Sequence, residues 1–466
     1  MTRQEALALL ALPQEQAVQK IQELARKARL WEQQVQAAAT DTTDAPSPTT
    51  PSGMTAPYEK PAHRTRHRKP GQKKGHAGTR RRLPDPIDET QEHTLEHCPD
   101  CGQPLGAPCR EHRRIIEDLP PVKPQAHSHR VNGYWCGHCR KIVTPRVTDA
   151  LPRATLGLQV LVYRAWLHYL LGVSVGNIAH LLSVGYAFKV SPGGLTQAWA
   201  HLATWLESYY EQIEQQVRAS GVLHADETGW RVNGRTHWLW AFCSERLCYY
   251  LIDRRRSSAV VARVLGEVFD GILISDFYGA YNLVESWAKQ RCFFHLFTEL
   301  IKVDKRNLHP SWQAFRRRLS RLLKDAMRLN TQRSALHPMV FARRKRRLHQ
   351  RLDQLIADPW NDADAQRLAR RLKSFRGELL TFLDHKGVSP TNNHAERQMR
   401  KPVAARKICQ QNRSQRGATT HAILLALFRT AELQGHQPVD FVISLTKAAI
   451  AGQPVALASP DLSQAA

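Results

Sequence analysis

The stretch that decides the fold is GVLHADETGWRVNGRTHWLWAF, residues 221–242. Two strand-like runs flank Asn233-Gly234, the dipeptide that most strongly favours a two-residue hairpin turn. A third apolar run, LCYYLI at 247–252, predicts another strand directly afterwards. The segment therefore predicts three consecutive strands of one sheet.

Downstream of these strands, predicted helices and strands alternate. SSAVVARVLGEVF at 257–269 predicts a helix, and GILISD at 271–276 a strand. ESWAKQ at 285–290 predicts a short helix, and RCFFHLF at 291–297 a fifth strand. Three strands followed by alternation imply a mixed sheet with helices on its faces. This order is that of a ribonuclease-H-like core, within a multidomain α+β fold.

Two aspartates follow apolar runs in these strands, Asp226 after LHA and Asp276 after ILIS. Each carboxylate is therefore expected where an apolar strand ends near the sheet edge. Hydrolysis of a phosphodiester needs charge neutralisation at the attacking and leaving oxygens, which Mg²⁺ ions held by carboxylates supply. Either aspartate taken alone equally fits a residue that caps the next turn.

A third acid is indicated by its surroundings. Glu396 lies near the start of a helix predicted from SPTNNHAERQMRKPVAARK, residues 389–407. An acid among cations is expected where phosphates and metal ions are bound together; the alternative is an ordinary ion pair on a solvated face. The cations expected to contact DNA here are Arg397, Arg400, Lys401, Arg406 and Lys407.

Four cysteines form two CxxC pairs, Cys98 with Cys101 and Cys136 with Cys139. Two such pairs are typical of a structural zinc site closed by four thiolates; the alternative is four plain reduced cysteines. Residues 92–150 are therefore predicted to form a zinc-ribbon-like module. No disulfide framework is expected, and Cys109, Cys243, Cys248 and Cys409 are predicted to be packing residues.

The charge balance is strongly basic, with 67 Lys and Arg against 41 Asp and Glu. A net charge of +26 favours a polyanionic partner, above all nucleic acid. Residues 63–82 carry nine Lys or Arg and no acid, among them Lys69, Lys73 and Lys74. This arm either follows DNA phosphates or only increases solubility.

The remaining regions are predicted to be helices and a linker. Residues 14–38 predict either a short coiled coil or an amphipathic helix packed on its own chain, and the Pro-rich stretch 40–62 a linker. Residues 153–218 predict helices, including a helix, turn and helix that either binds DNA or packs generically. No long apolar run and no signal peptide are found, which predicts a cytoplasmic protein without membrane contact.

Together these motifs resemble the transposases of the bacterial insertion sequence 66 family. The resemblance rests on KPGQKKGHAG, CPDCG, CGHC, HADETGWRVNGRTHWLW, ISDFYGAYN, CFFH and NNHAERQMRKPVAARK, in the family's order. It implies a DDE transposase whose acid triad is Asp226, Asp276 and Glu396. It further implies two Mg²⁺ or Mn²⁺ ions at the triad, a structural zinc ion, and a helical insertion between Asp276 and Glu396.

The activity implied is metal-dependent cleavage of DNA at the terminal repeats of the element, followed by strand transfer through the freed 3′-hydroxyl. The expected partners are double-stranded DNA, further copies of the chain in a homo-oligomer, and small accessory proteins of the same element, in the bacterial nucleoid. The alternatives are a transposase-derived DNA-binding regulator without catalysis, a nuclease that only hydrolyses DNA, and a basic RNA-associated protein.

One motif departs from the family pattern. The family continues CxxH with Arg-rich residues, whereas Cys292-Phe-Phe-His295 is followed here by Leu-Phe-Thr-Glu. We therefore expect His295 to lie beside the triad as a supporting residue, or to be a core histidine.

These motifs divide the chain into six predicted parts. They are 1–39 (N-terminal helix), 40–91 (linker and basic arm), 92–150 (zinc-binding module), 151–218 (helical domain), 219–435 (catalytic domain with a helical insertion at about 298–380) and 436–466 (C-terminal helix and tail).

Overall fold

The computed structural model describes residues 86–110, 112–116, 123–453 and 455–457. The predictions for the N-terminal helix at 14–38, the linker at 40–62 and the basic arm at 63–82 fall outside the described residues. Lys69, Lys73 and Lys74 lie in that arm, so their expected contacts with DNA stay predictions.

A mixed five-stranded sheet lies at the centre of the fold. Its strands are β3 (Val222–Val232), β4 (Arg235–Cys243), β5 (Cys248–Asp253), β6 (Val268–Ser275) and β7 (Glu285–Arg291). They lie in the order β5-β4-β3-β6-β7, with β3, β4 and β5 antiparallel and with β6 and β7 parallel to β3. Asn233 and Gly234 have φ of 49° and 72°, the left-handed values that the predicted hairpin turn requires. The prediction of a mixed sheet is confirmed.

Two predicted elements after β6 are wrong. Residues 285–290, predicted as a helix, lie in β7, and residues 293–297 of the predicted fifth strand begin helix α7 (Phe293–Asp304). The first four residues of β7 alternate in exposure, whereas the buried residues of α7 recur at intervals of three and four. Windows of about seven residues are too short for periodicity to distinguish a helix from a strand. The link from β6 to β7 is also shorter than the usual crossover between parallel strands, so a second strand is not expected so soon.

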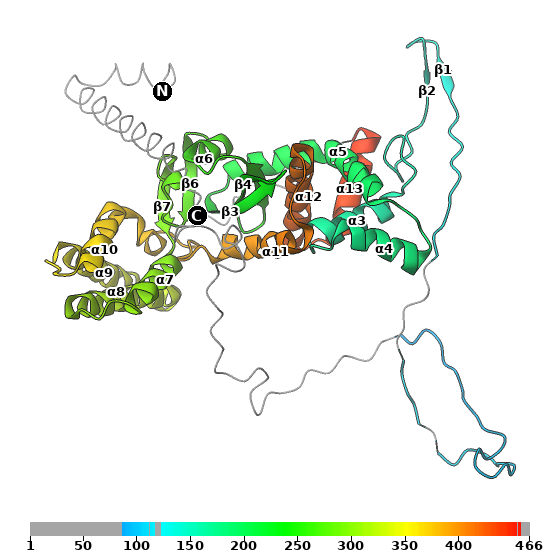
Figure 1. Ribbon diagram of the computed structural model, residues 1–466, viewed down its shortest axis with the longest axis horizontal. Coiled ribbons are helices and arrows are strands. Elements are labelled where there is room, and N and C mark those ends of the chain that lie inside the picture. Colours follow the sequence, from blue (N-terminus) through cyan, green and yellow to red (C-terminus); the bar gives the residue numbers. More distant parts are fainter. Residues whose placement is uncertain (1–85, 111, 117–122, 454, 458–466) are drawn as a thin grey trace.

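Helices cover both faces of the sheet and extend the fold at two ends (Figure 1). They are α3 (Leu158–Tyr169), α4 (Val175–Tyr186), α5 (Pro192–Arg218), α6 (Ser258–Leu265), α8 (Pro310–Thr331), α9 (Pro338–Ala357), α10 (Ala363–Ser374), α11 (Asn393–Cys409), α12 (Gln415–Leu433) and α13 (Pro438–Ala451). The helices α8–α10 lie at the end of the molecule away from α3 and α4. The predicted helical insertion between the second and third acids is therefore present.

Strand β6 separates two hydrophobic cores. Leu273 points into the larger core, which the sheet shares with α3, α5, α12 and α13. Ile272 and Ile274, on the opposite face, belong to a second core formed with α7–α10. The insertion thus has a core of its own, and α3–α5 share the core of the sheet.

Helices α4 and α5 form the helix, turn and helix predicted from the sequence. Helix α4 ends at Ala187 in the left-handed region, with φ of 51°. Helix α5 begins behind Ser191, whose hydroxyl accepts a hydrogen bond of 3.0 Å from the Gly194 amide. Before these helices, β1 (Tyr134–Cys136) and β2 (Lys141–Val143) pair as an antiparallel hairpin.

One cysteine pair departs from the sequence-based expectation. Cys243 and Cys248, predicted to be packing residues, are joined by a disulfide across the turn between β4 and β5. The register explains the pairing, because the two residues are direct partners on neighbouring strands. Both are buried.

No helix in the described part of the chain has the length and apolarity needed to cross a membrane.

His421 joins three elements inside the larger core. Its ring lies edge-on to Tyr169 of α3, with centroids 5.2 Å apart, and 5.1 Å from Trp230 of β3. Its Nε2 is buried without a hydrogen-bond partner. Burial, helped by the charge of His168, lowers the pKa of His421 to about 3 from the ordinary value of 6.5.

We expect His421 to make the fold acid-sensitive. Between pH 6.5 and about 3, the unfolded chain takes up a proton at this position that the folded chain does not. The free energy of unfolding should therefore fall by about 2–3 kcal/mol on going from pH 6.5 to 4.5. Denaturant unfolding across this range should show that the free energy of unfolding depends less steeply on pH in His421→Phe than in wild type. The control is His436→Gln, a change at an exposed histidine. Equal slopes in His421→Phe and wild type would contradict this account.

Candidate active site

The parallel pairing of β3 with β6 sets the positions of the first two acids. His224 pairs with Ile274, and two residues further along each strand lie Asp226 and Asp276. The two carboxylates therefore stand at the same level on neighbouring strands. Asp276 directly follows β6 as predicted. Asp226 lies inside β3 and not at its end, because β3 continues as the partner of β4 after its pairing with β6 stops.

Asn392 brings the third acid to this sheet edge. Its side chain is fully buried and donates from Nδ2 to the carbonyl of Ala225, at 2.7 Å. Its Oδ1 lies 3.1 Å from Nδ1 of His224. The Asn392 carbonyl accepts the helical bond from the Glu396 amide, at 3.1 Å. Glu396 therefore lies one turn into α11, a helix whose start is bonded to Ala225, the residue before Asp226.

Cys292 ties together the ends of three elements. Its amide donates to the Ser275 carbonyl at the end of β6, at 2.9 Å. Its Sγ accepts from the amide of Asn392, at 3.1 Å. Because α7 begins at the next residue, Cys292 and His295 lie on one side of its first turn. The ligand atoms of Cys292, His295 and Glu396 all lie within 4.8 Å of one another.

The electrostatics at this edge are those of crowded carboxylates. Burial raises the pKa of Asp226 well above its usual range, and the charges of Glu227, Asp276 and Glu396 raise it further. Oε1 of Glu396 is buried and has no hydrogen-bond donor. Carboxylate oxygens without donors are the ligands that Mg²⁺ and Mn²⁺ prefer. The residues present therefore fit a divalent cation.

Glu227, the neighbour of Asp226, was not singled out from the sequence. It is buried, and its Oε1 accepts from Nη2 of Arg256, at 2.8 Å. The hydroxyl of Tyr281 donates to its other oxygen. Tyr281 lies in the short 3-10 helix Gly279–Tyr281 that follows Asp276, so this buried network holds the loop carrying the second acid. The sequence signal that could have identified Glu227 is its position as an acid inside a predicted strand.

Arg291, at the end of β7, supports the second acid from the other side. Its guanidinium is fully buried and donates from Nη1 to the Asp276 carbonyl, at 2.8 Å, and from Nη2 to Oδ1 of Asn282, at 2.7 Å. Its Nε donates to Glu378 at 2.5 Å. The backbone of Asp276 is thus held by a charge-assisted network. The incorrect strand prediction for 291–297 concealed this role.

The cations expected to contact DNA along α11 differ in accessibility. Arg397, Arg400 and Lys407 are exposed. Lys401 is half-buried and paired with Glu432 at 2.9 Å. Arg406 is buried, and its Nη1 donates to Oγ1 of Thr228 at 2.9 Å and to the Gly229 carbonyl at 2.5 Å. The expectation for Arg406 is therefore corrected, because its guanidinium is held by β3.

The predicted zinc cysteines form two separate turns. In the first, the Gly102 amide donates to the Cys98 carbonyl at 2.8 Å; in the second, the Cys139 amide donates to Sγ of Cys136 at 3.4 Å. Hydrogen bonds from Cys101 lower the pKa of Cys98, and those from Cys139 lower that of Cys136. Among the described residues no cluster of four thiolates forms, and Figure 1 shows β1–β2 far from the segment around residue 100.

The mixed sheet, with acids at matching positions on neighbouring parallel strands, is compatible with the ribonuclease-H-like core of DDE enzymes. In a comparison with protein families, residues 155–420, more than half of the chain, match the family described as "Transposase IS66 family". The chain belongs to this family of transposases. A comparison with curated proteins found no match.

Asn392 is expected to position Glu396. Asn392→Ala removes two buried hydrogen bonds to β3 and should lower the free energy of unfolding by about 2–4 kcal/mol. Mn²⁺ should also raise the melting temperature less in this variant, because Glu396 is no longer held against the sheet.

Denaturant unfolding and thermal shift with Mn²⁺ measure the two effects. The exposed neighbour offers a matched control, and Asn393→Ala should leave both quantities near those of wild type. A loss of stability with an unchanged Mn²⁺ response would show that Asn392 supports the fold without positioning the acid.

Proposed function

We propose that this transposase binds the terminal repeats of an insertion sequence, cleaves DNA there in a metal-dependent reaction and joins the freed 3′-hydroxyl to target DNA. Membership of the family supports a DNA-processing enzyme of the DDE type. The observation that carries the finer proposal is the convergence of Asp226, Asp276 and Glu396 from three distant segments on one sheet edge.

In this proposal the three acids hold divalent cations, Mg²⁺ or Mn²⁺, two at the triad. Bound there, the cations neutralise charge on the attacked phosphodiester and on the leaving 3′ oxygen. The protein contributes position. Asn392 holds Glu396 against β3, and Arg291 with the Glu227 network holds the loop of Asp276. Such a site works by orientation and preorganised charge.

Exposed cations beside the acids would hold the DNA backbone. Arg397 and Arg400 follow Glu396 on α11, and Lys407 lies two turns further along the helix. Their side chains are accessible, unlike that of Arg406. Phosphate contacts of this kind fix the orientation of the duplex without reading its sequence. The helix, turn and helix formed by α4 and α5 is the proposed reader of the terminal repeats.

The triad is tested by cleavage and joining of a labelled duplex that carries the ends flanking the gene. Asp276→Asn and Glu396→Gln should each lower the rate at least about 10³-fold with Mg²⁺ or Mn²⁺, while duplex binding stays within a few-fold of wild type. Asp270→Asn changes an exposed acid on β6, the strand that precedes Asp276; it is the matched control and should cleave normally.

Retained cleavage in either triad variant would contradict the assignment of that acid. Hydrolysis without joined products in wild type would favour a nuclease. Tight binding of the ends without cleavage in any protein, with accessory proteins added, would favour a regulator without catalysis.

We further propose that Cys98, Cys101, Cys136 and Cys139 hold one structural zinc ion. The lowered pKa values of Cys98 and Cys136 support it, because zinc binds the thiolate. The ion would draw the two turns together.

Zinc content by elemental analysis of the purified full chain tests this site. Wild type should carry about one equivalent of zinc, and Cys98→Ser with Cys101→Ser should carry almost none. Cys109→Ser, a change at an exposed cysteine of the same segment, should retain it. Zinc-free wild type, or a double variant that keeps its zinc, would overturn the proposal.

A further inference from the structure

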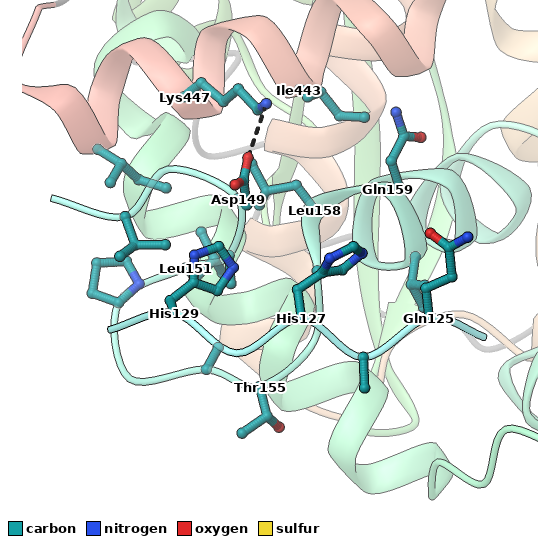
Figure 2. Close-up of a pocket in the computed structure, with 18 of the residues that line it drawn as sticks. Gln125, His127, His129, Asp149, Leu151, Thr155, Leu158, Gln159, Ile443 and Lys447 are labelled. Atoms are coloured by element: carbon teal, nitrogen blue, oxygen red, sulfur yellow. Dashed lines mark ion pairs between the residues drawn. The ribbon is translucent and has the colours of Figure 1, made fainter. Parts of the chain in front are cut away.

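A large basic pocket lies away from the acids, between the helices α3, α4, α5 and α13 and two extended segments, 123–129 and 145–155 (Figure 2). Its volume is about 1660 Å³. The Lys and Arg residues that line it are Lys123, Arg146, Arg153, Arg164 and Lys447. The lining holds one acid, Asp149, which is paired with Lys447 at 3.2 Å. The pocket therefore has a surplus of positive charge.

Arg164, on α3, is the unusual member of this lining. It is only 7% exposed, and its Nε is buried without a hydrogen-bond partner. Within the described part of the chain no carboxylate pairs with it. Its guanidinium lies over the rings of Tyr163 and Tyr186, 4.9 and 5.1 Å from their centroids. The aromatic rings stabilise the cation but do not accept a hydrogen bond from its buried Nε–H.

Among the described residues, Arg291 has the hydrogen-bond acceptors that Arg164 lacks. That buried guanidinium reaches four different acceptor residues, including the carboxylate of Glu378. A buried charge without such partners is destabilising, so it is retained where an anion supplies them. The fork of N–H donors in arginine matches the oxygens of a phosphate group.

The rest of the lining suits the same ligand. His127 and His129 lie side by side on the extended segment, and Gln125, Gln159 and Thr155 add uncharged polar groups. The volume exceeds that of a usual small-molecule site, which favours part of a polymer over a single ion.

We propose that this pocket binds phosphate groups of the DNA backbone, with Arg164 as the innermost donor. The proposal rests on the proposed function, because it gives the transposase a second DNA contact separate from the acids. Inorganic phosphate or a nucleotide presents the same chemistry, so the test includes these sources.

The test uses Arg164→Met in the full chain. Removing an unpaired buried charge should leave the melting temperature of the free protein equal to or above that of wild type. Affinity for the end duplex, measured by fluorescence anisotropy, should fall by about tenfold, and the slope of log K against log salt should become shallower by about 0.9. Arg343→Gln, an exposed change on α9, measures the effect of losing one charge elsewhere.

A second variant covers the case in which Arg164→Met fails to fold. Arg153→Gln changes an exposed cation of the same pocket and should weaken duplex binding more than Arg343→Gln does. Inorganic phosphate and ATP are then tested by thermal shift on wild type. Stabilisation by either at concentrations that do not compete with the duplex would assign the pocket to a free anion and overturn the DNA proposal.

The failures of the two proposals are distinguishable. If wild type binds and cleaves the duplex while the variants at Arg164 and Arg153 match Arg343→Gln in affinity and salt slope, the pocket proposal alone is wrong. A lowered melting temperature in Arg164→Met with unchanged DNA affinity would assign Arg164 to packing with the two tyrosines. If wild type itself does not bind the duplex, the proposed function is wrong.

Discussion

The candidate site depends on the buried hydrogen bonds of Asn392. One amide group reaches the backbone of β3 and the ring of His224, while the amide nitrogen of its backbone reaches the sulphur of Cys292. These bonds join the start of α11 to the sheet and to the start of α7. Because they are buried, breaking them leaves polar groups without water or partners, so the junction is held in one geometry.

This junction explains how the chain tolerates a long helical insertion between two acids that belong together. The insertion leaves the sheet at Cys292 and the chain returns at Asn392, so its entry and exit are bonded to each other. Helices α8–α10 pack around their own core, which meets the sheet through Ile272 and Ile274. The insertion therefore adds a second body without separating Asp276 from Glu396.

The charged side chains at the sheet edge are of two kinds, which differ in whether a partner of opposite charge lies within the protein. Glu227 and Arg291 are neutralised within the protein, by Arg256 and Glu378. They hold the loop after β6 and need nothing from outside. Asp226 is instead surrounded by other acids, and burial and their charges raise its pKa. Glu396 has a buried oxygen without a hydrogen-bond donor. The divalent cation of the proposed function would relieve that imbalance.

The sequence by itself determined the local features, because hairpin chemistry and apolar periodicity act over a few residues. The Asn233-Gly234 turn, the strand before Asp276 and the helix carrying Glu396 all follow from neighbours in the chain. The tertiary structure decided what depends on distant partners. It made 285–291 an edge strand beside β6, placed Arg406 inside against β3, and joined Cys243 to Cys248. It also brought Glu396 to Asp226 through Asn392, since no local pattern encodes a hydrogen bond across 167 positions.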